Sequence, residues 1–96
     1  MFFVKIHKGQ TELIAICDAD LIGKTFSEGR LELKISEHFY KGEEKGSEEV
    51  EGIMKEESDF NLVGEKAIKL ALKVGLIDQD CIATIQGVPH GQVISC

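Results

Sequence analysis

The longest periodic segment of this chain is DFNLVGEKAIKLALKVGLI, residues 59–77. At ~100° per residue its apolar and small side chains cover roughly 200° of a helical wheel, which predicts a mostly buried helix from Phe60 to Gly75. The wheel also contains a seam of small residues, formed by Gly64, Ala67, Ala71 and Gly75. Because small side chains let another backbone come close, we expect this seam to lie against a sheet.

Short segments that alternate apolar and polar residues flank the predicted helix. They are FFVKIHK, ELIAIC and GRLELKIS before it, and CIATIQ and QVIS after it. Alternation with a period of two is typical of half-buried strands. The stretch GVPHG, residues 87–91, predicts a turn between the last two strands. The grouping of strands and helices indicates an α+β fold: a small antiparallel or mixed sheet of about five strands with two helices packed on one face.

Residues 41–59 carry most of the negative charge. The net charge of the chain is −6, and this segment holds eight acidic residues against three lysines, or −5, so the rest of the chain carries −1. We expect a flexible acidic loop at about 41–47, followed by a second helix that Ser47 caps and whose apolar stripe is Val50, Ile53 and Met54. Generic binding of DNA or RNA through a basic face is disfavoured, whereas a local contact to RNA stays open.

The length of 96 residues and the hydrophobic share of 43% predict one domain, residues 1–96. No apolar run approaches the ~18 residues that a membrane span needs. The N-terminal MFFVKIHKGQ does not have the composition of a signal peptide. We therefore expect a soluble cytoplasmic protein without a membrane partner.

The three cysteines, Cys17, Cys81 and Cys96, are widely spaced and form no CxxC pair. This spacing predicts neither a zinc ribbon nor a thioredoxin-like site. We expect two small buried residues and one exposed thiol, Cys96, that can form adventitious dimers. The sequence also has no phosphate-binding glycine loop, no serine nucleophile elbow and no HExxH motif. We therefore predict no cofactor and no metal, and a binding protein rather than an enzyme.

One polar constellation is a candidate binding site. Asn61 and Glu65 lie four residues apart, so a helix would place them on one face. His90 and Gln92 would join them if the last hairpin lies against that helix, and the fixed φ of Pro89 would direct His90 toward them. A carboxylate, an imidazole and two amides suit a polar ligand or a nucleotide base, and they also suit acid–base chemistry.

Each of these residues also has a structural explanation. Asn61 can cap a helix, Glu65 can pair with Lys69, and His90 can bond a neighbouring carbonyl. Cys81 and His90 would form a thiol–imidazole pair in principle, but a thiol in an apolar strand is usually inert.

Four segments, LIGKTFSEG, ISEHFY, NLVGEKA and IQGVPHGQV, resemble the archaeal family known as domain of unknown function 424. The likeness covers nearly the whole chain in order, and its most specific parts are Asn-Leu-Val-Gly-Glu and Gly-Val-Pro-His. The family typically has alanine at the position of Gly91, a change that would loosen the turn. The resemblance implies an archaeal source and a small α+β fold but no activity. By association it suggests a translation-related protein or RNA as the partner.

Three hypotheses for the function follow. The first is a non-enzymatic binding module, linked to translation or RNA metabolism. The second is a small enzyme that uses His90 and Glu65 as acid and base. The third is a structural protein that forms oligomers through an apolar sheet edge.

Overall fold

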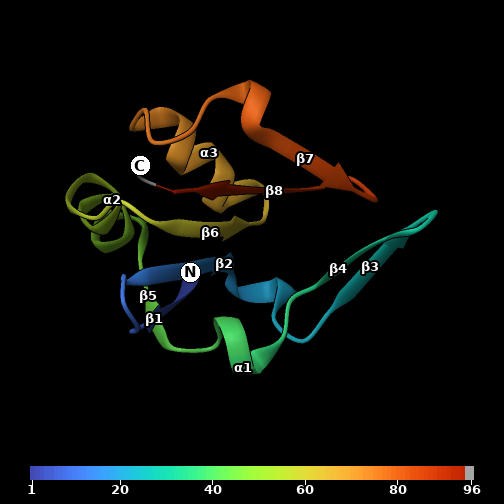
Figure 1. The fold of residues 1–96 in the computed structure, drawn as a ribbon, viewed down its shortest axis with the longest axis horizontal. Coiled ribbons are helices and arrows are strands. Elements are labelled where there is room, and N and C mark those ends of the chain that lie inside the picture. Colours follow the sequence, from blue (N-terminus) through green and yellow to red (C-terminus); the bar gives the residue numbers. More distant parts are fainter. Residues whose placement is uncertain (95–96) are drawn as a thin grey trace.

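The computed structural model describes residues 1–94 and shows a six-stranded sheet beside a separate two-stranded hairpin (Figure 1). The elements in chain order are β1 (Phe2–His7), β2 (Leu13–Asp18), η1 (Ala19–Leu21), β3 (Thr25–Glu28), β4 (Leu31–Lys34), α1 (Glu37–Tyr40), β5 (Glu43–Lys45), α2 (Ser47–Glu56), β6 (Phe60–Val63), α3 (Glu65–Lys73), η2 (Gln79–Cys81), β7 (Ile82–Ile85) and β8 (Val88–Val93). The predicted α+β class is confirmed.

The strand order of the sheet is β5-β1-β2-β6-β8-β7. β2 and β6 are parallel, and the other neighbouring pairs are antiparallel. Parallel neighbours require a long crossover. Here the crossover contains the β3–β4 hairpin, α1, β5 and α2, so it covers parts of both faces before the chain returns to the sheet as β6.

Helices α2 and α3 pack on one face of the sheet. Their inward side chains meet the apolar residues of β1, β2 and β6 in the main hydrophobic core. Val50 and Met54 of α2 and Ala71 of α3 are almost fully buried. In the predicted stripe of α2, Val50 and Met54 are buried and Ile53 is half-buried. In the predicted small-residue seam, Ala67 and Ala71 are buried in α3, whereas Gly64 precedes this helix and Gly75 is exposed. The removal of these apolar surfaces from water is the main force that holds the two helices on the sheet.

The opposite face carries α1 and the β3–β4 hairpin, which pack in a second cluster with Ala15, Cys17 and Val63 of the sheet. Tyr40 of α1 is buried there. His7 is half-buried. Its ring stacks on Phe39 with centroids 4.5 Å apart, and its Nε2 forms a hydrogen bond with the Phe39 carbonyl at 2.8 Å.

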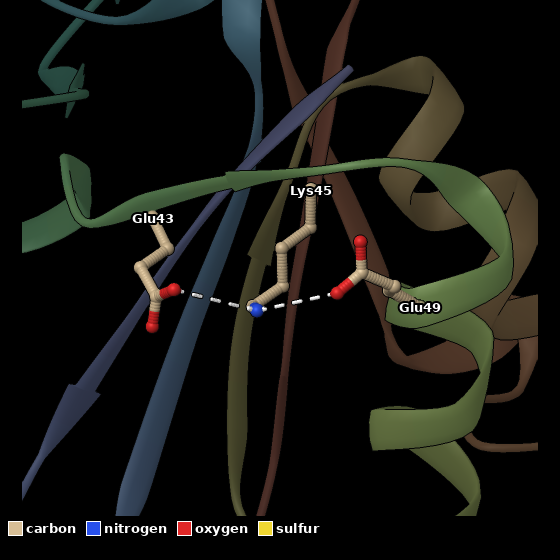
Figure 2. A network of polar contacts seen from close by, with 3 residues as sticks. All are labelled: Glu43, Lys45 and Glu49. Atoms are coloured by element: carbon tan, nitrogen blue, oxygen red, sulfur yellow. Dashed lines mark hydrogen bonds and ion pairs between the residues drawn. The ribbon is translucent and has the colours of Figure 1, made fainter.

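The acidic stretch at 41–47, expected to be a loop, contains the edge strand β5, which pairs with β1. Lys45 on this strand lies between two carboxylates, 3.7 Å from Glu43 and 3.4 Å from Glu49 (Figure 2). The contact to Glu49 links the strand to the first turn of α2. Because both glutamates are largely exposed, we assign these ion pairs a small contribution of about 0–1 kcal/mol each.

The predicted helix from Phe60 to Gly75 is wrong in its first turn. Phe60–Val63 is strand β6, and α3 begins only at Glu65. Gly64 separates them with φ at 110°, a value that belongs to neither a helix nor a strand. A short apolar run such as FNLV has no periodicity that tells a buried strand from a helix.

The predicted turn at GVPHG is also shifted. The β7–β8 turn is at Gln86 and Gly87, which have φ of 51° and 79°. Pro89, His90 and Gly91 lie inside β8. Pro89 is accommodated near the start of β8, where its carbonyl accepts the N–H of Gly64 at 2.9 Å.

Candidate functional site

The β3–β4 hairpin crosses to the far edge of the sheet and meets the β7–β8 turn (Figure 1). At this contact the backbone N–H of Gln86 donates a hydrogen bond to Oε1 of Glu28 at 2.8 Å. A cavity of ≈ 340 Å³ is lined by residues of β4, α1, β6, η2, β7 and β8. We call it the hairpin cavity.

Three of the predicted site residues, Asn61, His90 and Gln92, line the hairpin cavity. The sheet register brings them together, because Asn61 pairs with Gln92 and Val63 pairs with His90. Paired residues of neighbouring strands share a face, and so do residues two apart on one strand. The imidazole and the two amides therefore lie on one face of the sheet.

Apolar groups complete the lining of the hairpin cavity. Leu33 comes from β4, Tyr40 from α1, and Val63 and Ala83 from the sheet. Burial raises the pKa of Tyr40 to about 12, so its phenol stays neutral at ordinary pH. No carboxylate is among the described residues that line this cavity. It is therefore a mainly apolar space with a few polar groups, the usual composition of a small-molecule site.

His90 has an unsatisfied ring nitrogen. Its Nε2 is buried and has no hydrogen-bond partner among residues 1–94. Leaving a buried polar atom unpaired costs about 1–3 kcal/mol, so native proteins rarely do it. The alternative that this nitrogen bonds a neighbouring carbonyl is not realised in the structure.

Glu65 and Pro89 lie apart from this group. Both line a second cavity of ≈ 210 Å³, together with Asp18 and Lys66. Glu65 is the first residue of α3, and Asn61 is in β6, so the expected shared helical face does not exist. Glu65 also forms no ion pair with Lys69 within the part of the chain described. The expected four-residue site is thus divided between two cavities.

Asp18 lies in this region although no sequence pattern places it there. Its position before η1 suggests a cap for that helical turn, yet it makes no side-chain cap there. Its carboxylate instead accepts the backbone N–H groups of Lys66 at 3.0 Å and Ala67 at 2.8 Å, in the first turn of α3. Burial raises the pKa of Asp18, and the two amide hydrogen bonds oppose that rise. No local pattern can reveal a cap that comes from a residue so distant in sequence.

The cysteines differ from expectation in one respect. Cys17 is buried as predicted, and burial, assisted by the charge of Asp18, raises its pKa to about 12. Cys81 is exposed rather than buried, because it ends the 3-10 turn η2 instead of lying inside a strand. It lines the hairpin cavity with His90, and no hydrogen bond joins the two in the described structure. Cys96 lies outside the described residues.

Metal-ligating side chains do not converge in the described structure. No group of three or more histidine, cysteine, aspartate or glutamate side chains within residues 1–94 is placed to hold a metal ion. None of the described helices has the length and apolar character that crossing a membrane demands.

The fold and the cavity together define a small α+β protein with a mainly apolar cavity between a sheet and a hairpin. The family model described as "Protein of unknown function (DUF424)" matches residues 6–95, and the chain belongs to this family. Its structure is similar to the "Crystal structure of an uncharacterized conserved protein from Methanopyrus kandleri". The two chains share 31% sequence identity with a TM-score of 0.75, and the match covers 95% of this chain and 88% of the other. No curated protein matches at a significant level.

Proposed function

We propose that this protein is a non-enzymatic binding module whose hairpin cavity takes up a nucleobase. Two observations carry the proposal: His90 lines this cavity, and its Nε2 is buried and has no hydrogen-bond partner among residues 1–94. A ligand that bonds this nitrogen would remove the cost of leaving it unsatisfied.

The chemistry around His90 fits the edge of a base. A neutral imidazole nitrogen donates or accepts according to its tautomer, and the amides of Asn61 and Gln92 each offer a donor and an acceptor. The edge of a nucleobase carries the same alternation of donors and acceptors. Leu33 and Tyr40 supply apolar surface for its faces. Unpaired RNA bases are commonly recognised by this combination of edge hydrogen bonds and contacts to the ring.

The charge distribution favours base recognition over phosphate recognition. The net charge of −6 gives the protein no general attraction for a polyanion. The most acidic segment, residues 41–59, contributes β5 and α2, whereas the hairpin cavity is lined by other elements. We therefore infer that the partner presents an unpaired base, either in an RNA of the translation or RNA-processing machinery or as a free nucleotide. Its binding should depend weakly on salt.

The alternative of an acid–base enzyme has less support. His90 and Glu65 line different cavities, and the described lining of the hairpin cavity contains no carboxylate to act with the imidazole. General acid–base catalysis requires such groups within hydrogen-bond reach of one reacting molecule.

The test is equilibrium binding of the four 5′-ribonucleotides and of a pool of short single-stranded RNAs. We expect at least one base to bind, and His90→Ala to abolish that binding while the melting temperature stays nearly unchanged. His38→Ala is the matched control, because His38 is an exposed histidine outside the hairpin cavity. Preference for the RNA pool over free nucleotides would identify RNA as the source of the base.

Absence of binding by every nucleotide and by the pool at millimolar concentration would refute the proposal. So would a His90→Ala variant whose binding falls only in proportion to lost stability. The link to translation is tested separately, by recovering partners from cell extract with and without ribonuclease. Recovery of no ribosomal, tRNA or translation-factor component would contradict it.

A further inference from the structure

A larger groove lies on the other face of the sheet, away from the hairpin cavity. It is bounded by the start of β1, the start of α2 and one side of α3, and its volume is ≈ 680 Å³. The residues that give it its character are Phe2, Leu70, Lys66, Lys69 and Lys73. We call it the lysine groove.

Positive charge is concentrated along one wall of the lysine groove. Lys66, Lys69 and Lys73 are spaced three and four residues apart on α3, so they project along one side of the helix. Lys73 is engaged by Glu51 at 3.2 Å. Lys66 and Lys69 form no ion pair with any residue that the structure describes. Lys66 also lines the second cavity beside Asp18, and its positive charge stabilises the carboxylate of Asp18. In a chain of net charge −6, Lys69 therefore carries the least compensated charge of this wall.

The rest of the lysine groove is mainly apolar. Phe2 is buried at the base of β1, Leu70 is half-buried between the lysines, and the exposed side chain of Met1 adds to the lining. The volume falls in the range of about 300–1,000 Å³ that is typical of small-molecule sites. A purely ionic ligand would leave this apolar surface uncovered, and a purely apolar ligand would leave the lysines without a counter-charge.

We propose that the lysine groove binds a small amphipathic anion, with an apolar body against Phe2 and Leu70 and a phosphate or carboxylate head between Lys66 and Lys69. Charge complementarity selects the head, and the apolar lining selects the body. The proposal is independent of nucleobase binding, because the two cavities share no lining residue and lie on opposite faces.

The test ligands are decyl phosphate and decanoate, each used below its micellar concentration. Decanol represents the apolar body without the head, and inorganic phosphate represents the head without the body. Binding is followed by isothermal calorimetry and by amide shifts of α3 in NMR spectra. We expect each amphiphile to bind at least about tenfold more tightly than decanol or phosphate, because both parts of the ligand contribute.

The double variant Lys66→Gln with Lys69→Gln should weaken binding of the amphiphiles by about tenfold or more, as expected for the loss of charge-assisted hydrogen bonds. Lys8→Gln with Lys24→Gln, two exposed lysines outside the groove, should not.

Several results would overturn the proposal. Inorganic phosphate binding as tightly as decyl phosphate would show an anion site without an apolar subsite. Equal weakening by both lysine pairs would show a general charge effect. A third arm uses vesicles of phosphatidylcholine and phosphatidylglycerol: co-sedimentation with vesicles, without binding of the monomeric amphiphiles, would show a lipid surface instead. Binding of an acidic peptide but not of decyl phosphate would equally contradict it.

Discussion

The carboxylate of Asp18 occupies the space beside Gly64 that any other side chain would need. A Cβ added to Gly64 would lie 2.3 Å from Cγ of Asp18. This contact closes the junction between β6 and α3, since the same carboxylate accepts two backbone N–H groups of the first turn of α3. Because Gly64 has no side chain, the chain can turn sharply from β6 into α3, and the carboxylate of Asp18 can cap the first turn of α3.

Gly64→Ala should destabilise the protein by at least about 3 kcal/mol, because alanine is strained at this φ and its Cβ would displace Asp18. Urea denaturation measures the change. Gly52→Ala is the matched control: Gly52 lies in α2, and an added Cβ there meets nothing within 4 Å. The control should stabilise by about 0.5–1 kcal/mol. Equal effects of the two substitutions would show that the contact between Asp18 and Gly64 does not restrict the fold.

The raised pKa of Asp18 predicts how stability depends on pH. The unfolded state loses this proton near the ordinary pKa of 3.8, while the folded state keeps it to a higher pH because the carboxyl is buried. The stability contribution of Asp18 is thus fully present below the unfolded pKa and is lost as pH rises through the folded pKa. Asp18→Asn should remove this dependence. The difference in unfolding free energy, wild type minus variant, should fall as pH rises from 3.8. A difference that grows over this range would mean that the amide hydrogen bonds dominate and lower the pKa.

Ala71→Leu tests the packing of α3 on the sheet. Ala71 is fully buried, so additional methylene groups have no free space. We expect a loss of about 1–3 kcal/mol, the usual cost of overpacking. An unchanged denaturation midpoint would require residue 71 to face solvent.

Thiol labelling tests the two described cysteines. In a Cys96→Ser background, one thiol should react quickly with an aromatic disulfide reagent at mildly alkaline pH, and Cys81→Ser should remove that reaction. Cys17 should react only after denaturation, because it is buried and its pKa is raised to about 12. Because Cys81 lines the hairpin cavity, a bound nucleotide should slow its labelling. Rapid labelling of Cys17 in the native protein would contradict its burial in the core.

Local sequence patterns predict the elements that local interactions determine. The stripe of α2 follows from periodicity over a few residues, and Val50 and Met54 of that stripe are buried as predicted. The parallel pairing of β2 with β6 joins segments more than forty residues apart, and nothing near Phe60–Val63 indicates it. The helical interpretation of that run follows from extending the helical period of residues 65–73 back through it.

The difference between local and long-range interactions also explains which residues of the candidate site could be grouped from the sequence. His90 and Gln92 are grouped correctly although the sequence predicts His90 in a turn, because inside β8 they lie two residues apart and share a face. Asn61 joins them through the register of β6 and β8, whereas the predicted helix shared with Glu65 is wrong. Proline and glycine usually mark turns, so GVPHG predicts one, whereas the positive φ at Gln86 has no sequence marker. The cavity itself depends on how the β3–β4 hairpin packs, which no single segment encodes.

The most direct measurement of the central claim is the ¹⁵N NMR shift of the His90 ring during titration with the base that binds best. A hydrogen bond to the ligand should move the Nε2 resonance of His90 and leave that of exposed His38 unchanged. The His7 ring, already bonded to the Phe39 carbonyl, should also stay unchanged. If the ligand binds while the His90 resonance stays constant, or if all three rings shift alike, the hairpin cavity is not the binding site.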